Sequence, residues 1–305
     1  MAYDILFMGT PEFSVPVLKS LNSKYKILSV FTQPPKKKAR GQKILKSPIH
    51  LEAEKLELPV RFPENLDNNI DYKYIKESNV KFVIVVGYGQ IIPERFLKIK
   101  NLLFLNIHAS LLPRWRGAAP IQRSIMEMDE ETGISIMKIV KKLDAGPYMM
   151  QRKININTKD NYLSLSRRLS EISSNLILDA LTLLEKNEIN FQDQNEQLVT
   201  YAKKISKKEA EINWDETPKK LIAKINGLSP FPGAWFNHNG NRIKIIEAEI
   251  SDHQGKKGEI LTDDLVIGCQ NKSVKIKLLQ KEGKTVLNTK SFLTGYRINK
   301  GEILP

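Results

Sequence analysis

The sequence predicts an α/β protein in which a doubly wound, mostly parallel sheet is followed by a small β-barrel. In the first 190 residues, short apolar runs alternate with segments whose apolar residues recur every three or four positions. The run at 82–87 is nearly all apolar and β-branched, which is typical of a strand covered on both faces. Residues 207–305 instead contain short alternating runs divided by Asn, Asp and Gly turns, which is typical of a barrel. We therefore expect domains at 1–190 and 207–305, joined by a polar linker at 191–206.

The first domain is predicted to repeat a strand and helix unit. Strands are expected at 3–8, 25–32, 82–87 and 102–106, and helices at 14–21, 48–56, 72–77 and 120–126. Strands that alternate with helices in this way form parallel βαβ units and hence a doubly wound sheet. Two further strands, 132–140 and 147–156, are joined by a turn and lead to a long amphipathic helix at 161–185.

The second domain is predicted to consist mostly of short strands. These are expected at 242–250, 258–261, 265–269 and 274–279, after a short helix at 218–225. The segment 226–235 is rich in Pro and Gly and is expected to form turns.

Composition and charge exclude several classes of protein. The single cysteine, Cys269, excludes an intramolecular disulfide and fits a reducing compartment, and the four histidines are scattered, so we expect no metal site. We see neither a signal peptide nor an apolar stretch near the ~20 residues of a transmembrane helix, so we expect a cytoplasmic protein that does not enter membranes. The formal charge of +14 favours a polyanionic partner, because Lys and Arg displace counterions from phosphates.

Polar side chains appear abruptly where the predicted strand 102–106 ends. Asn106 and His108 stand two residues apart on an extended chain, so both project from the same face. Asp144 lies in the turn between the two following strands. An amide donor, a titratable ring and a carboxylate that orients the ring are the groups that acyl or formyl transfer to an amine requires. We predict that these three side chains form one catalytic site.

Four motifs around these residues are specific enough to indicate a family. They are Asn106-x-His108, Ser110-Leu-Leu-Pro113, Arg116-Gly-Ala-Ala-Pro120 and Leu143-Asp-Ala-Gly146. Together they resemble the 10-formyltetrahydrofolate-dependent formyltransferases. The segments 8–13, 31–34 and 40–41 narrow the resemblance to the methionyl-tRNA formyltransferase family. The resemblance covers almost the whole chain and is densest at 5–149.

The resemblance implies a reaction and a fold. A formyltransferase-like sheet domain would carry the chemistry, and the barrel would be OB-like. The formyl group of 10-formyltetrahydrofolate, the folate donor, would pass to the α-amino group of initiator methionyl-tRNA, with no metal involved. Asn106 and protonated His108 would stabilise the oxyanion, and Asp144 would orient His108. We expect the enzyme to act as a monomer.

The resemblance also assigns residues to the two substrates. The backbone at Tyr88, Gly89, Gln90 and Ile91 would border the pterin, and Ser110, Leu111, Leu112 and Pro113 would line the tetrahydrofolate pocket, with 114–117 at its mouth. Residues 36–46 carry six positive charges and no acid, so self-repulsion is expected to keep them mobile without an anionic ligand. The equivalent family loop engages the acceptor arm of tRNA. The residues predicted to bind tRNA are Lys36, Lys37, Lys38, Arg40, Lys43, Lys207 and Lys208, with the strand lysines Lys272, Lys275 and Lys277 as further candidates.

Two other functions are compatible with parts of the sequence. One is a related formyltransferase that acts on a small amine, either glycinamide ribonucleotide or an amino sugar nucleotide. The other is a non-catalytic RNA-binding protein with an OB-like domain. The basic loop and the basic second domain oppose the first alternative, because a small acceptor needs neither.

Overall fold

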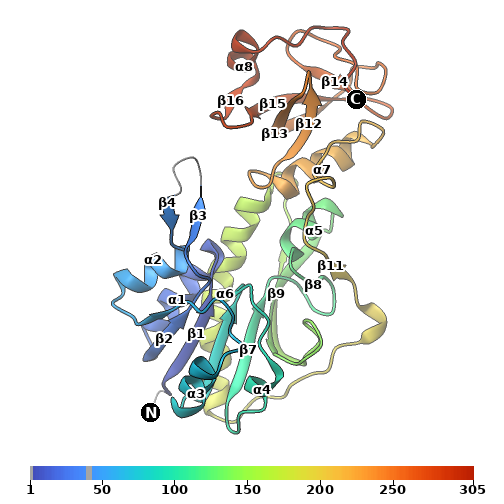
Figure 1. Ribbon diagram of the computed structural model, residues 1–305. Helices are drawn as coiled ribbons and strands as arrows, with labels where there is room; N and C mark the ends of the chain where they lie inside the picture. The colour runs from blue at the N-terminus through green and yellow to red at the C-terminus, as the bar shows by residue number, and fades with distance from the viewer. Residues whose placement is uncertain (1–2, 39–42) are drawn as a thin grey trace. The chain divides into compact units, whose positions relative to one another are not determined.

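A computed structural model describes residues 3–38 and 43–305, and it confirms the predicted fold class. A seven-stranded sheet has the order β10-β9-β7-β6-β1-β2-β5 (Figure 1). Its strands are β1 (Ile5–Gly9), β2 (Ile27–Phe31), β5 (Val60–Arg61), β6 (Phe82–Val86), β7 (Leu103–His108), β9 (Glu131–Lys138) and β10 (Tyr148–Asn155). The five strands from β7 to β5 pair in parallel, whereas β9 runs antiparallel to β7.

Helices cover both faces of this sheet, which explains why β1 and β6 are buried along their whole length. On one face, Ile75 of α3 (Asn69–Glu77) and Phe96 of α4 (Glu94–Leu97) belong to a cluster with side chains of β1 and β6. Elsewhere α1 (Val15–Asn22) is tied to α6 (Tyr162–Glu185), because the Ser20 hydroxyl donates to the Ser174 carbonyl at 3.1 Å. The helix α2 (Pro48–Lys55) begins directly after Ser47, whose side-chain hydroxyl accepts a hydrogen bond from the backbone amide of His50.

The long helix α6 matches the prediction for 161–185 to within one residue. Its predicted apolar stripe is buried at Leu165, Leu169, Leu176, Ile177, Ala180 and Leu181. Leu163, near its start, is exposed instead. The 3.6-residue period therefore identified the packed face correctly.

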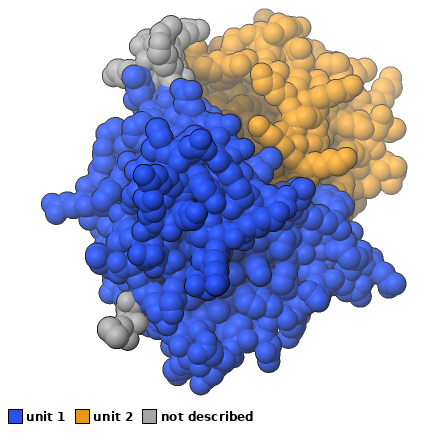
Figure 2. All heavy atoms as spheres, turned by 60° about the horizontal axis from the view of Figure 1, so that its bottom comes forward, with its two compact units in different colours: residues 1–117, 133–154, 166–201 blue, residues 118–132, 155–165, 202–305 orange. Residues whose placement is uncertain are grey.

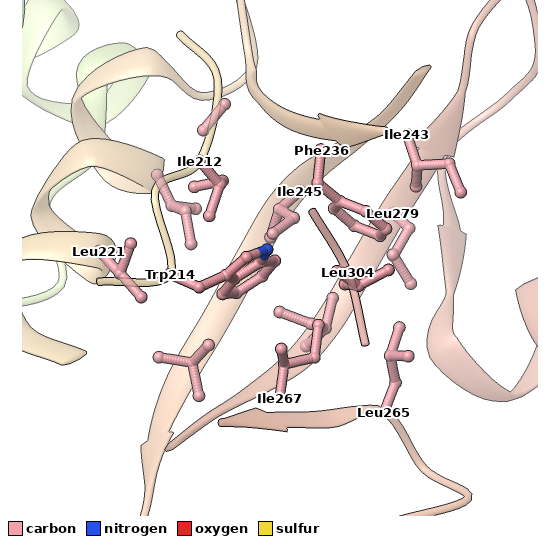
Figure 3. Close-up of a cluster of buried hydrophobic side chains, with 14 of the residues drawn as sticks. Ile212, Trp214, Leu221, Phe236, Ile243, Ile245, Leu265, Ile267, Leu279 and Leu304 are labelled. Atoms are coloured by element: carbon pink, nitrogen blue, oxygen red, sulfur yellow. The ribbon is translucent and has the colours of Figure 1, made fainter. Parts of the chain in front are cut away.

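The second part of the chain is built on a five-stranded antiparallel sheet. Its order is β12-β13-β15-β14, with β16 added to β15; the strands are β12 (Ala234–His238), β13 (Asn241–Ser251), β14 (Val266–Gly268), β15 (Ser273–Lys281) and β16 (Leu287–Asn288). The sheet curves as a half-barrel, consistent with the predicted OB-like fold. Trp214 lies in its core beside Phe236 and Leu221 (Figure 3). Further elements are α7 (Pro218–Leu228) and α8 (Thr289–Gly295).

Several local predictions in this second part were wrong. The segment expected to be turns, 226–235, does turn at 229–232, but it also contains the end of α7 and the start of β12. The predicted strand at 258–261 contributes only isolated bridges, from Glu259 to Ile303 and from Ile260 to Ile267. The helix α8, and α4 in the first part of the chain, were also not predicted; α4 spans only four residues, about one turn, which is too few to show a period.

Contacts divide the chain into two compact units, shown in Figure 2. One comprises residues 1–117, 133–154 and 166–201, and the other 118–132, 155–165 and 202–305. The second unit thus includes α5 (Pro120–Met126), whose contact with α7 requires a glycine: a Cβ on Gly227 would lie 2.7 Å from Cγ of Met126. The predicted domain boundaries at 190 and 207 stay a prediction. No helix in the described ranges is long and apolar enough to cross a membrane.

Candidate active site

The predicted catalytic side chains Asn106, His108 and Asp144 lie together at the end of β7. Asn106 and His108 belong to the strand itself, and Asp144 lies in the turn between β9 and β10. The Asn106 amide donates to Oδ1 of Asp144 over 3.4 Å, and Nδ1 of His108 lies 3.7 Å from Oδ2 of the same carboxylate. The backbone amide of Gly117 donates to Oδ2 over 2.8 Å. One carboxylate therefore faces both the amide and the ring.

The tautomer of His108 follows from its second contact. Its Nε2 lies 2.8 Å from the carbonyl oxygen of Trp115, which can only accept a hydrogen bond. Nε2 must therefore carry a proton, and Nδ1 is the nitrogen that faces Asp144. The ring is only 5% exposed, so its orientation is fixed by packing as well as by these contacts.

The segment predicted to line the folate pocket, residues 110–113, is held by Ser135 and Gln151. The Ser135 hydroxyl donates to the Ser110 carbonyl over 2.7 Å and accepts from the amide of Leu112 over 3.0 Å. Gln151 donates to the Leu112 carbonyl at 2.9 Å. Ser110 and Leu112 are buried, whereas Leu111 and Pro113 are partly exposed. The latter two are the side chains that a ligand can reach.

The segment predicted to border the pterin, residues 88–91, follows β6. The Tyr88 side chain is buried, and burial raises the pKa of its phenol well above the usual range. The Gln90 side chain makes its hydrogen bonds within the protein. Its carboxamide accepts from the Leu66 amide and donates to the Pro63 carbonyl, each over 2.8 Å. Gly89 has φ +82°, a conformation that favours glycine, and Ile91 is 88% exposed. Only Ile91 presents its side chain to solvent here.

The Arg116 side chain lies in the interior, although residues 114–117 were expected at the mouth of the pocket. It is fully buried, its Nε donates to Gln194 over 3.0 Å, and its Nη2 donates to Glu196 over 2.7 Å. The expectation was wrong for this residue because a basic run in the sequence does not reveal a carboxylate 80 positions away. The sequence analysis did not single out Gln194 or Glu196. The one feature that points to this region is the polar composition of residues 191–206, directly after the predicted first domain.

The basic loop forms a hairpin in the part that the structure describes. β3 (Lys36–Lys38) pairs antiparallel with β4 (Lys43–Leu45), so Lys36 is opposite Leu45. Lys36 is exposed. Arg40, predicted to contact tRNA, lies outside the described residues.

In the second unit the two sets of predicted lysines differ in their surroundings. Lys207 and Lys208 are exposed, and the Trp235 indole donates to the Lys207 carbonyl over 3.1 Å. The guanidinium of Arg242 lies 4.3 Å from the centre of the Trp235 ring. Lys272, just before β15, and Lys275 and Lys277, within it, instead form ion pairs with Asp252, Asp264 and Glu249. Their charge is therefore partly neutralised within the unit.

Comparisons with known proteins agree with this architecture. A family model described as formyl transferase matches residues 4–181, and one described as formyl transferase, C-terminal domain, matches residues 204–297. The chain is 48% identical to a methionyl-tRNA formyltransferase of Pelagibacter ubique, covering 99% of this chain and 98% of that one. It is 42% identical to a methionyl-tRNA formyltransferase of Cereibacter sphaeroides, with 98% of each chain covered.

Solved structures share the fold at low sequence identity. HypX from Aquifex aeolicus, solved in complex with tetrahydrofolic acid, is similar over the whole of this chain and 51% of its own, with a TM-score of 0.70 and 18% identity. The sugar 3N-formyl transferase WlaRD is similar over 93% of this chain and all of its own, with a TM-score of 0.65 and 17% identity. At these identities the likeness concerns the fold alone.

Proposed function

Because this chain belongs to the methionyl-tRNA formyltransferase family, we infer that it transfers the formyl group of 10-formyltetrahydrofolate to the α-amino group of methionyl-tRNA. The products are N-formylmethionyl-tRNA and tetrahydrofolate. The observation that carries this function is the similarity to relatives of that name over nearly the full length of both chains. A small-amine formyltransferase and a non-catalytic RNA-binding protein are both less favoured, since they leave part of this match unexplained.

We propose that Asn106, His108 and Asp144 are the catalytic residues. The neutral amine attacks the formyl carbon, and the resulting oxyanion must be stabilised as it forms. The bond to Asp144 uses one N–H of the Asn106 amide, so its second N–H is available to that oxygen. Since Nε2 of His108 is engaged by the Trp115 carbonyl, Nδ1 is the nitrogen able to act at the reaction centre when protonated. Asp144 would orient His108 and can accept the proton of the amine through water; that proton then passes to N10 as the bond between N10 and the formyl carbon breaks, which releases tetrahydrofolate.

We also propose the substrate contacts. The backbone of Tyr88, Gly89, Gln90 and Ile91 and the loop Ser110, Leu111, Leu112 and Pro113 would bind the folate, supported by their position beside the ends of β6 and β7. Lys36, Lys37, Lys38, Arg40 and Lys43, in the basic loop 36–46, would guide the acceptor end of initiator tRNA. Lys207 and Lys208 would contact its phosphates, supported by their exposure and by the nearby Arg242.

We propose that the enzyme is a monomer and that it works in the cytoplasm. The single cysteine, Cys269, is buried and unpaired, which suits a reducing compartment. Light scattering of the purified protein measures the oligomeric state directly, and a mass of twice the chain would contradict the monomer.

A parallel transfer assay tests the function. Labelled 10-formyltetrahydrofolate is incubated with the protein and either methionyl-tRNA, glycinamide ribonucleotide or an amino sugar nucleotide. We expect label in methionyl-tRNA alone, and uncharged tRNA serves as the control. Transfer to a small amine but not to methionyl-tRNA would contradict the proposal, as would tRNA binding without transfer to any acceptor.

A further inference from the structure

The turn that carries Asp144 adopts a backbone conformation that it does not favour by itself. Asp144 has φ +45°, in the left-handed region that non-glycine residues adopt only uncommonly. Two positions on, a Cβ on Gly146 would lie 1.8 Å from the carbonyl oxygen of Lys138, so the turn passes very close to β9. Contacts from elsewhere in the unit must therefore hold this geometry.

Gln194 supplies two of those contacts. Its amide nitrogen donates to the carbonyl of Asp144 over 2.9 Å and to the carbonyl of Gly146 over 2.6 Å. Its side-chain oxygen accepts from Nε of Arg116 over 3.0 Å. A flipped amide would put its oxygen against two carbonyl oxygens and its NH2 against a guanidinium, so only one orientation satisfies all three partners.

Arg116 is fixed in turn by Glu196. That carboxylate accepts from Nη2 of the buried Arg116 and also pairs with Lys142, two residues before Asp144, over 2.5 Å. These two hydrogen bonds lower the pKa of Glu196 to about 2. The next residue after Arg116, Gly117, donates its amide to the Asp144 carboxylate. Gln194, which contacts Arg116, thus holds the backbone carbonyl of Asp144, and the amide of Gly117 holds its carboxylate.

We infer that Gln194 is a positioning residue, whose carboxamide fixes the Asp144 turn so that the carboxylate faces Asn106 and His108. Gln194 lies between the segments that match the two family models, at 4–181 and 204–297. It is 9% exposed although its neighbours Asp193 and Asn195 are exposed. The inference rests on the proposed catalytic role of Asp144. On that basis, the segment between the two family matches contributes a residue to the proposed active site.

Two substitutions of similar size separate the possible roles of this side chain. Gln194→Met keeps the length and apolar packing but removes all three hydrogen bonds. Gln194→Glu keeps the acceptor for Arg116 but replaces the donor with a carboxylate that repels the two carbonyls. Gln192→Met and Gln192→Glu are the matched controls, because Gln192 is exposed and pairs with Tyr148 only through the backbone.

Formylation of methionyl-tRNA gives kcat and KM, and hydrogen exchange of residues 142–147 gives the mobility of the turn. We expect both Gln194 variants to lower kcat by about 10- to 100-fold, because displacing a catalytic group by about 1 Å can cost 10²-fold. We expect KM for the tRNA to stay unchanged and exchange in the turn to accelerate, while the rest of the sheet keeps its protection. The Gln192 variants should match the wild type in both measurements.

Three results would overturn the inference. Wild-type kcat in Gln194→Met would mean that the side chain acts only by packing. Wild-type kcat in Gln194→Glu would mean that the two N–H donors are dispensable. A higher KM for methionyl-tRNA with unchanged kcat would mean that Gln194 contributes to substrate binding and not to catalysis. An inactive wild type would refute the proposed function instead, and the exchange measurement would still decide whether Gln194 holds the turn.

Discussion

The turn that carries Asp144 and the lysine-bearing surface of the second unit differ in how their charged groups are arranged. Around Asp144 the polar groups are few, mostly buried and connected to one another, from Asn106 and His108 to Gln194. On the second unit the lysines are exposed or half-exposed, and several have one carboxylate partner each. Stabilising a transient oxyanion requires fixed donors in a water-poor site, whereas attracting RNA phosphates requires only positive charge near the surface. Substitutions should accordingly affect kcat in the first region and salt-dependent binding in the second.

The largest expected effect is the loss of an oxyanion donor. Asn106→Ala should lower kcat by at least about 10²- to 10³-fold, and His108→Ala should fall in the same range. Single-turnover formylation with saturating methionyl-tRNA measures this step. Circular dichroism of the variants verifies the fold. An Asn106→Ala enzyme within a few-fold of the wild type would contradict the catalytic assignment.

Removing the charge of Asp144 should have a comparable or slightly smaller effect. Asp144→Asn keeps the side-chain volume but removes the carboxylate proposed to orient His108 and to accept the proton of the amine, so kcat should fall by about 10²-fold. The same single-turnover assay applies, with the exposed Asp193→Asn as the control. If both variants retained wild-type kcat, the carboxylate would have no role in the chemistry.

Substitution of the exposed lysines should affect binding rather than catalysis. The double variant Lys207→Ala with Lys208→Ala should raise KM for methionyl-tRNA several-fold. It should also reduce the salt dependence of KM. The slope of log KM against the logarithm of the salt concentration should fall by about one unit for each phosphate that a lysine no longer neutralises. Measuring KM from low to moderate salt tests this expectation. Lys73→Ala is the control, because Lys73 is exposed, is paired with Glu77 on α3 and has no proposed role in binding. A fall in kcat with an unchanged salt slope would contradict a phosphate-binding role.

The smallest expected effect concerns stability in acid. The pKa of Glu196 is lowered to about 2 by its hydrogen bonds to Arg116 and Lys142, so its ionised form favours the folded state. This contribution is present above the ordinary carboxyl pKa of about 4.5 and is lost as the pH falls through about 2. Denaturant unfolding of the wild type and of Glu196→Gln should therefore differ at about pH 6 and converge toward about pH 2, where the carboxylate of the folded protein takes up its proton. A difference that does not vary with pH would assign the effect to something other than ionisation.

The pattern of apolar residues located most of the regular structure. The long helix was predicted at 161–185 and lies at Tyr162–Glu185, and the helix predicted at 120–126 lies at Pro120–Met126. The central strands were found because both faces are buried, which leaves a continuous apolar run. One failure was β12, which begins at the end of a segment rich in Pro and Gly, where turn-forming residues obscure the alternation.

By itself the sequence determined the sheet, the alternation of strands and helices, and the three side chains Asn106, His108 and Asp144 that lie together, since burial imposes a period and the specific motifs single out these residues. Only the tertiary structure decided that Arg116 is interior, that Nδ1 of His108 faces Asp144, and that Gln194 holds the turn. Gln194 and Asp144 are 50 positions apart in the chain, and Arg116 and Glu196 are 80 apart. No local pattern encodes such a contact, because a buried polar group is specified by its partner in space and not by its neighbours in the chain.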